Sequence, residues 1–182
     1  MEELILQCKE LGLGSRIVRS ALEIKMKEVE EIGGESLEEF HHLNQKEEMG
    51  IDRWLRLAKG REYDGDEVML ELLLEIYKKL EHIQQQISPT PTSLLHLEQS
   101  SLTCYIGHEF LCLKEKMQEG KMYYARVDLP SFPNKLIPFY LKMLTPNIAR
   151  IIKMGEMHTR SYDSYIVECE RLEIRSKKEE RL

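Results

Sequence analysis

The spacing of apolar residues changes from helical to strand-like part-way along the chain. In residues 15–32 the apolar residues Val18, Leu22, Val29 and Ile32 recur at helical spacing, which predicts a helix that ends at Gly33-Gly34. The run Ser36-Leu37-Glu38-Glu39 has the form of a capping box and predicts the start of a second helix. These patterns, with the one over residues 66–87, predict that residues 1–87 form a helical region.

The strongest periodic pattern lies in residues 66–87. Six apolar residues follow one another at steps of four and three: Met69, Leu73, Ile76, Leu80, Ile83 and Ile87. This spacing places them on one face of a helix as a heptad seam. A narrow seam on an otherwise polar helix suits packing against another helix, so we expect a homo-oligomer formed through residues 66–87. The alternative is that the seam packs on helices of the same chain.

Residues 88–99 are a predicted linker, because Pro89 and Pro91 interrupt the helix. Beyond it the period becomes two, as in Lys121–Leu129, where apolar Tyr123, Ala125, Val127 and Leu129 alternate with the other side chains. Several short strands joined by turns are typical of a small barrel or sandwich. The predicted strands are 102–106, 109–113, 121–129, 135–144, 147–154 and 164–167, followed by a helix over 168–182.

The charge is unevenly distributed along the 182 residues, whose net charge is −6. Residues 1–87 hold 12 Lys or Arg against 20 Asp or Glu, and residues 88–182 hold 14 against 12. Neither half is basic enough for a nucleic-acid surface. No apolar run reaches the roughly 18 residues of a membrane span, and no cationic leader is visible. The four cysteines form no CxxC pair, so we expect a reduced cytoplasmic protein without membrane insertion.

The order of elements in residues 100–182 resembles a PilZ domain. The likeness is carried by Ile106-Gly107-His108-Glu109-Phe110, by Met117–Lys121 leading to Val127–Pro130, by Ala149-Arg150-Ile151-Ile152 and by Tyr165–Arg171. The resemblance implies an α+β protein: a helical N-terminal region (1–87), a linker (88–99), and a six-stranded antiparallel barrel with a C-terminal helix (100–182). It also implies a bacterial, non-catalytic regulator of cyclic-di-GMP signalling, in flagellar, pilus or polysaccharide systems.

Two motifs usually bind cyclic-di-GMP in this family, and the chain departs from both. In the expected [D/N]-x-S-x-x-G window only Gly107 fits, since Leu102 and Cys104 replace the acid or amide and the serine. The expected R-x-x-x-R window, residues 88–100, contains no Lys or Arg. Arginine forks provide the main attraction for phosphates, so binding in the usual manner is disfavoured. The remaining candidates for an unconventional site are Gly107 with Arg126, Arg150 and Arg160.

Other chemistry has less support in the sequence. An R-x-x-x-R string does run from Arg171 to Arg175, but it lies in the predicted terminal helix and we take it as coincidental. Cys104, His108 and Cys112 are spaced by four, yet structural cysteines and a surface histidine explain them better than a zinc site does. No acid–base pair or cofactor loop stands out, so we expect no enzyme, metal or cofactor.

Three functions remain open from the sequence. The first is an adaptor of cyclic-di-GMP signalling that acts by binding a protein partner, whose identity the sequence does not give. The second is a true cyclic-di-GMP receptor that binds through an unconventional surface. The third is a helical scaffold whose barrel has no signalling ligand.

Overall fold

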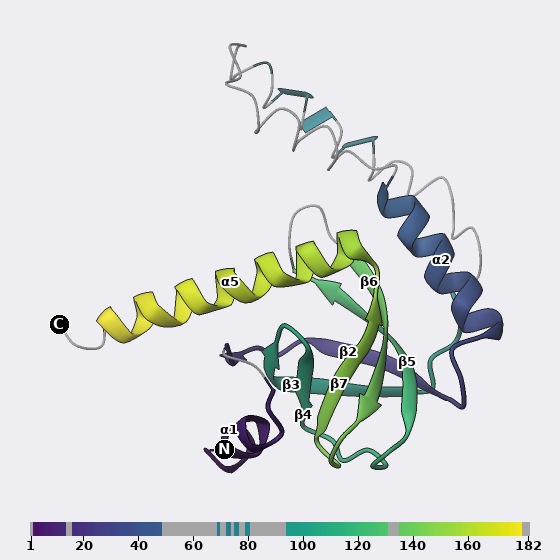
Figure 1. The fold of residues 1–182 in the computed structure, drawn as a ribbon. Coiled ribbons are helices and arrows are strands. Elements are labelled where there is room, and N and C mark those ends of the chain that lie inside the picture. The colour runs from purple at the N-terminus through teal and green to yellow at the C-terminus, as the bar shows by residue number, and fades with distance from the viewer. Residues whose placement is uncertain are drawn as a thin grey trace. The chain divides into compact units, whose positions relative to one another are not determined.

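The structure, a computed structural model, describes residues 2–13, 16–48, 94–130 and 135–179, together with positions 69, 72, 73, 75, 76, 79 and 80. The chain forms two compact units. One comprises Met1–Glu48 and His96–Leu182, and the other comprises Met49–Leu95. The first unit contains a barrel and three helices, and it is described first (Figure 1).

The barrel is a closed antiparallel sheet. Its neighbouring strands follow the order β1-β3-β2-β5-β6-β7-β4, and β4 also pairs with β3, which closes the sheet on itself. The three helices pack around it. The elements are α1 (Glu2–Glu10), β1 (Val18–Arg19), β2 (Glu23–Val29), α2 (Gly34–Glu48), β3 (Gln99–Gly107), β4 (Phe110–Leu113), β5 (Met122–Leu129), β6 (Lys135–Met143), β7 (Ile148–Met154) and α5 (Glu156–Glu179).

The short strands β1 and β2 are two parts of one interrupted strand. Both pair with β3, but Val18 lies opposite Ile106 and Glu23 lies opposite Leu102, a register that shifts by one residue between them. Counted this way the barrel has six strands. The predicted α+β architecture, a six-stranded antiparallel barrel with a C-terminal helix, is therefore confirmed.

The predicted helix over residues 15–32 is wrong. Residues 23–29 form β2, whose side chains are alternately exposed and buried from Glu23 to Met26. Because β2 pairs with β3 on one side and β5 on the other, it supplies ladder hydrogen bonds that a helix there would leave unmade. The expected helical region 1–87 is thus wrong for residues 18–29. The strands of the barrel therefore come from residues that precede and residues that follow the 49–95 unit in sequence.

The predicted last strand, Ser164–Val167, is also wrong, whereas the other five predicted strands are confirmed as β3 to β7. Residues 164–167 lie inside α5, which begins at Glu156 and contains the predicted terminal helix up to Glu179. His158, Tyr162 and Ile166, spaced by four, are all buried, so this face of the helix packs against the barrel. The β1–β2 strand takes the place of the missing sixth strand.

The barrel interior is filled by the inward-facing half of every strand. Ile24 and Met26 meet Ala125 and Val127 across β2 and β5, and all four are buried. Tyr162 and Ile166 of α5 join the same core cluster. The described side chains that fill the barrel make its outer faces the surfaces open to a ligand.

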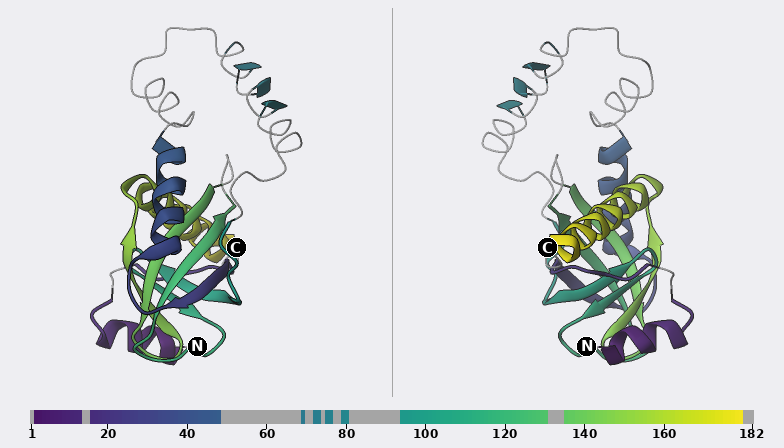
Figure 2. Two further views of the ribbon diagram at one scale, coloured as in Figure 1. Left: turned by 90° about the vertical axis from the view of Figure 1, so that its right-hand side faces the viewer. Right: turned by 90° about the vertical axis from the view of Figure 1, so that its left-hand side faces the viewer.

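Helices α1 and α2 pack on different outer faces of the barrel (Figure 2). Helix α1 ends at Glu10 and is followed by Gly12, whose φ of 67° allows a Schellman turn in which the N–H of Leu13 donates to the carbonyl of Cys8 at 2.9 Å. Helix α2 begins at Gly34, so Ser36 lies inside the helix and not at the N-cap position of the predicted capping box. Ser36 and Glu39 both contact the barrel, through the hydroxyls of Tyr140 and Tyr124.

In the second unit the described positions between residues 69 and 80 are all helical. The apolar side chains described on this helical stretch are exposed: Met69, Leu72, Leu73, Ile76 and Leu80. Among the helices that the structure describes, none combines the length and the apolar character needed to cross a membrane.

Candidate functional site

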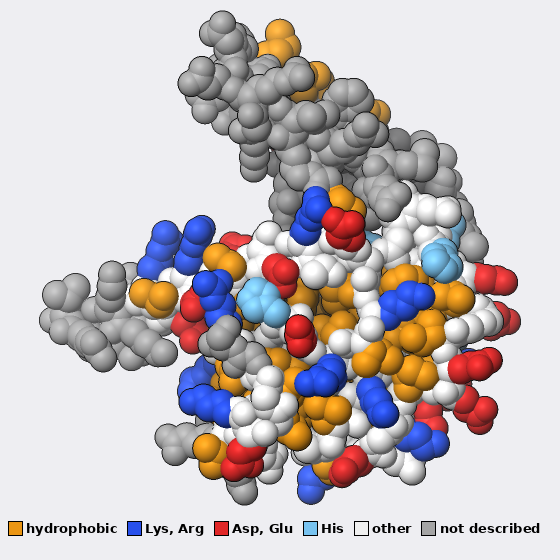
Figure 3. All heavy atoms as spheres, viewed as in Figure 1, with side chains coloured by type: hydrophobic (Ala, Val, Ile, Leu, Met, Phe, Trp, Pro, Cys, Tyr) orange, Lys and Arg blue, Asp and Glu red, His pale blue; other side chains and the backbone are white. Residues whose placement is uncertain are grey.

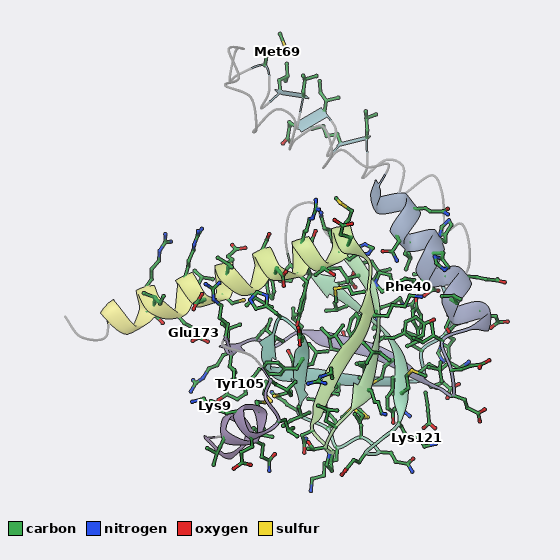
Figure 4. The ribbon with its side chains drawn as sticks, in the orientation of Figure 1. Lys9, Phe40, Met69, Tyr105, Lys121 and Glu173 are labelled. Carbon is green, nitrogen blue, oxygen red and sulfur yellow. The ribbon has the colours of Figure 1, made fainter. Side chains whose placement is uncertain are left out.

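A shallow groove lies between β1 and the second half of α5. It is lined by Arg19, Cys169, Leu172, Glu173, Arg175 and Ser176. The groove forms where β1, which is only two residues long, lies beside the second half of α5. Figure 4 labels Glu173 on this stretch of α5.

Hydrogen bonds hold the two walls of the groove together. The backbone N–H of Arg19 donates to the Glu173 carboxylate at 2.6 Å, and the hydroxyls of Ser20 and Tyr165 lie 3.2 Å apart. Burial raises the pKa of Tyr165, so this hydroxyl keeps its proton at neutral pH. The groove walls are therefore fixed relative to each other by α5 side chains.

The two arginines at the groove favour an anionic ligand, but nearby carboxylates compete with it for them. Arg19 and Arg175 line it with one carboxylate, Glu173. Arg16, just outside, lies 3.7 Å from Glu170, and both side chains are substantially exposed. Guanidinium groups of this kind bind phosphate or carboxylate in two-pronged geometry. An anionic ligand would have to compete with the carboxylates of α5.

Gly107, one of the predicted ligand-binding residues, has a packing role. A Cβ atom at this position would lie 2.1 Å from Cε1 of Phe110, whose side chain is fully buried. Only a glycine leaves room for that ring. The structure thus supplies a structural reason for the one residue that fits the family's hairpin motif.

Arg126, the second predicted residue, lies on β5 beneath α2. Its Nη1 atom is 3.1 Å and 3.2 Å from the two carboxylate oxygens of Glu39, and the Arg126 side chain is only 9% exposed. Tyr124 donates to the same carboxylate at 2.6 Å. Burial, followed by that hydrogen bond, raises the pKa of Tyr124. Arg126 is therefore engaged with α2 and does not face solvent.

Arg150 and Arg160 do not join Arg126. Arg150 is exposed on β7 opposite Lys142 of β6, whereas Arg126 is opposite Pro138, four residues back along the same strand. Arg160 is exposed on α5 and forms an ion pair with Glu156 one turn earlier. The predicted ligand-binding residues thus lie at separate places on the barrel and α5.

The three residues Cys104, His108 and Cys112 do not come together in the structure. His108 Nδ1 lies 2.5 Å from a carboxylate oxygen of Asp163, whereas the two cysteines lie near Cys8 under α1. Among the described residues no group of three or more His, Cys, Asp or Glu is placed to hold a metal ion.

The predicted seam of the second unit is partly within the described residues. Met69, Leu73, Ile76 and Leu80 are helical, and their exposed fractions are 53%, 55%, 45% and 58%. Ile83 and Ile87 lie outside the described residues. Figure 3 shows a different character on the barrel face turned to the viewer, where Lys, Arg, Asp and Glu interrupt the apolar side chains.

None of the groove residues is among the predicted ligand-binding residues, and Arg19 escapes prediction because the apolar spacing of its segment indicates a helix. A signal for it was present. Leu22, Ile24 and Met26 alternate with Glu23, Lys25 and Lys27, the period of a half-buried strand. That reading would have placed Arg16 and Arg19 at the entry to the first strand of the barrel.

Comparisons with known proteins leave the family unassigned. No family model matches the chain, and no curated protein matches it. Among solved structures it is similar to a pathogenic protein of Xanthomonas campestris, described as a new tetrameric PilZ domain self-assembled through an unusual helical bundle. The similarity covers 94% of this chain and 98% of that one, with 10% identity and a TM-score of 0.46.

Proposed function

We propose that this protein is a non-catalytic regulatory adaptor that self-associates through residues 66–87 and uses the outer surface of its barrel to bind a protein partner. The filled barrel interior favours a surface-binding role. The resemblance of residues 100–182 to PilZ domains suggests cyclic-di-GMP signalling in the bacterial cytoplasm as the setting.

One observation carries the self-association. Met69, Leu73, Ile76 and Leu80 keep heptad spacing on a helix, and each of these side chains is about half exposed. Burying an apolar side chain of this size between helices contributes about 1.5–3 kcal/mol. A second copy of the same helix offers the complementary seam, so a homo-oligomer is the expected assembly.

Analytical ultracentrifugation of the full chain tests this proposal. We expect an oligomer, and we expect Leu73→Asp to dissociate it because a carboxylate would enter the seam. Leu72→Asp is the matched control: Leu72 is equally exposed at 55% on the same helix but lies one position off the seam. A wild-type monomer at high protein concentration, or equal effects of the two variants, would contradict the proposal.

A second candidate function is that of a cyclic-di-GMP receptor, and the groove beside β1 favours it. Arg19 and Arg175 line the same groove together with Ser176, which offers cationic forks and a hydroxyl to a phosphate. This site uses the first barrel strand and the end of α5, away from Arg126, Arg150 and Arg160.

Titration calorimetry with cyclic-di-GMP at physiological salt separates the two functions. If the groove is the site, Arg19→Ala and Arg175→Ala should each weaken binding at least tenfold, whereas Arg160→Ala should leave it unchanged. If no heat is detected for the wild-type chain at high concentration, the receptor function is excluded. The adaptor then remains as the function to pursue, through a search for its protein partner.

A further inference from the structure

Three thiols gather where α1 docks on the barrel. Cys8 of α1 and Cys112 of β4 are both fully buried, and their sulfur atoms lie 3.4 Å apart although 104 residues separate them in sequence. Cys104, on the neighbouring strand β3, is half-buried, and its thiol donates to the carbonyl oxygen of Cys112 at 3.3 Å. Apolar side chains surround the cluster and include Leu13, Phe110 and Ile148.

The two buried sulfurs are close enough to be joined by a small movement. A disulfide bond is about 2.05 Å long, so the sulfurs must approach by roughly 1.4 Å. Cys112 lies in a strand that pairs with β3 on one side and β7 on the other, which restrains it. Cys8 lies in a nine-residue helix. A helix this short is marginal alone in water and depends on its docking, so α1 is the side that can move.

We propose that Cys8 and Cys112 are a site of reversible oxidation, and that the disulfide they form fastens α1 to the barrel. The oxidant is a low-molecular-weight disulfide, RSSR. The Cys8 thiolate attacks one sulfur of RSSR, forms a mixed disulfide and releases RS⁻. The Cys112 thiolate then attacks the Cys8 sulfur and releases the second RS⁻. Each RS⁻ takes up one of the two protons that the protein thiols lose, so two protein thiols and RSSR give one protein disulfide and two RSH.

Docking of α1 controls how fast this reaction runs. Burial raises the pKa of both Cys8 and Cys112, so thiolates are scarce while the helix is in place. RSSR also cannot reach a fully buried sulfur. The reaction therefore starts from the state in which α1 has left the barrel, a local opening of low cost for a helix of only nine residues.

The disulfide decides whether the apolar face under α1 can be exposed. In the reduced protein α1 can leave and uncover Phe110, Ile148 and Tyr105, the last of which is labelled in Figure 4. In the oxidised protein the covalent link returns α1 to the same place after every opening. Because the link also closes a loop of about 100 residues in the unfolded chain, it should stabilise the fold.

The test is peptide mapping by mass spectrometry of the native full-length chain after incubation with oxidised glutathione. We expect a Cys8–Cys112 linkage, with Cys104 and Cys169 recovered as free thiols. The thermal midpoint should rise by roughly 5–10 °C and return on reduction. Cys169→Ser, a half-buried cysteine of α5 outside the cluster, should keep the linkage, and Cys8→Ser should lose both the linkage and the thermal shift.

The proposal is overturned if Cys8 and Cys112 are recovered free while glutathione is found only on Cys104 or Cys169. It is also overturned if the linkage forms only in denaturant, since that would describe the unfolded chain. The variant Cys104→Ser must retain the Cys8–Cys112 linkage. A linkage from Cys104 to either partner in the wild-type chain would assign the oxidation to a different pair.

Discussion

Two of the helices that pack on the barrel, α1 and α2, are held by different chemistry. Helix α1 docks through apolar side chains and thiols, among them Cys8, Phe110 and Ile148. Helix α2 docks largely through polar groups. Chief among them is the Glu39 carboxylate, which lies 3.1 Å from the Arg126 guanidinium. Apolar docking tolerates small shifts and brief release. Polar docking fixes one position, because a buried polar group without its partner costs about 1–3 kcal/mol.

Breaking the ion pair under α2 should have the largest effect on stability. Glu39→Ala removes the carboxylate that lies 3.1 Å from the Arg126 guanidinium, a side chain only 9% exposed, and this should lower the free energy of unfolding by roughly 3–5 kcal/mol. Urea denaturation followed by circular dichroism measures this. Replacing the whole network with apolar residues, Glu39→Leu, Arg126→Met and Tyr124→Phe together, should cost much less. An equal loss in both proteins would mean that packing, and not the charge, holds α2.

Two glycine substitutions sharpen the contrast between the faces. In Gly107→Ala the new Cβ would lie 2.1 Å from the ring of Phe110, which is fully buried and cannot move aside, so the free energy of unfolding should fall by about 2–3 kcal/mol. In Gly155→Ala the Cβ would lie 1.5 Å from Oδ1 of Asn44. That side chain is half-buried and can swing away, with the loss of its contact to His158, so about 1 kcal/mol is expected.

The control is Asn44→Ala. In that background Gly155→Ala should become nearly neutral, because the atom with which it collides is gone. Additive effects of Asn44→Ala and Gly155→Ala, measured by the same denaturation, would contradict the assigned contact.

Acid should lower the stability of the fold through His158, which contacts Asn44 of α2. Its side chain is 1% exposed, and burial, with the nearby charge of Lys135, lowers its pKa from 6.5 to about 4. The unfolded chain thus binds the proton more readily, so stability is complete above pH 6.5 and is lost as the pH falls toward 4. From pH 7 to pH 5 this residue should account for about 2 kcal/mol. His158→Gln should flatten that part of the stability–pH curve, and an unchanged curve would remove His158 as the cause.

These contrasts also explain what the sequence could predict. Strands with alternating residues, such as Met122–Leu129, were recognisable because the inner face of a barrel imposes a period of two. The apolar residues of 18–29 fit both the helical period and the strand period of two. The segment forms a strand because it pairs with β3 and β5, which are distant in sequence. The strand predicted for residues 164–167 is wrong because a helical spacing there is hidden by the residue types. Tyr162 and Ile166 sit at helical spacing, but the β-rich composition Tyr165-Ile166-Val167 conceals it.

The outer faces were harder to predict than the barrel. The partner of Arg126 comes from Glu39, 87 residues earlier, and the partner of Cys112 comes from Cys8, 104 residues earlier. No local pattern encodes such pairings. The end of α1 is a local feature by contrast, because the Schellman turn at Gly12 depends only on the residues that form it.

The smallest expected effect concerns the hydroxyl pair at the start of α2. Ser36 donates to the carbonyl of Gly33 at 2.9 Å, so the Tyr140 hydroxyl, also 2.9 Å from Ser36 Oγ, must be the donor between the two. Ser36→Ala leaves that buried hydroxyl without its acceptor and should cost about 1 kcal/mol. Tyr140→Phe added to Ser36→Ala removes the stranded donor. The double variant should therefore be less destabilised than the sum of the single variants, as a double-mutant cycle of urea midpoints would show. Strict additivity would mean that the two hydroxyls do not interact, and that α2 is held at this end by Phe40, which packs against the Tyr140 ring at 5.6 Å.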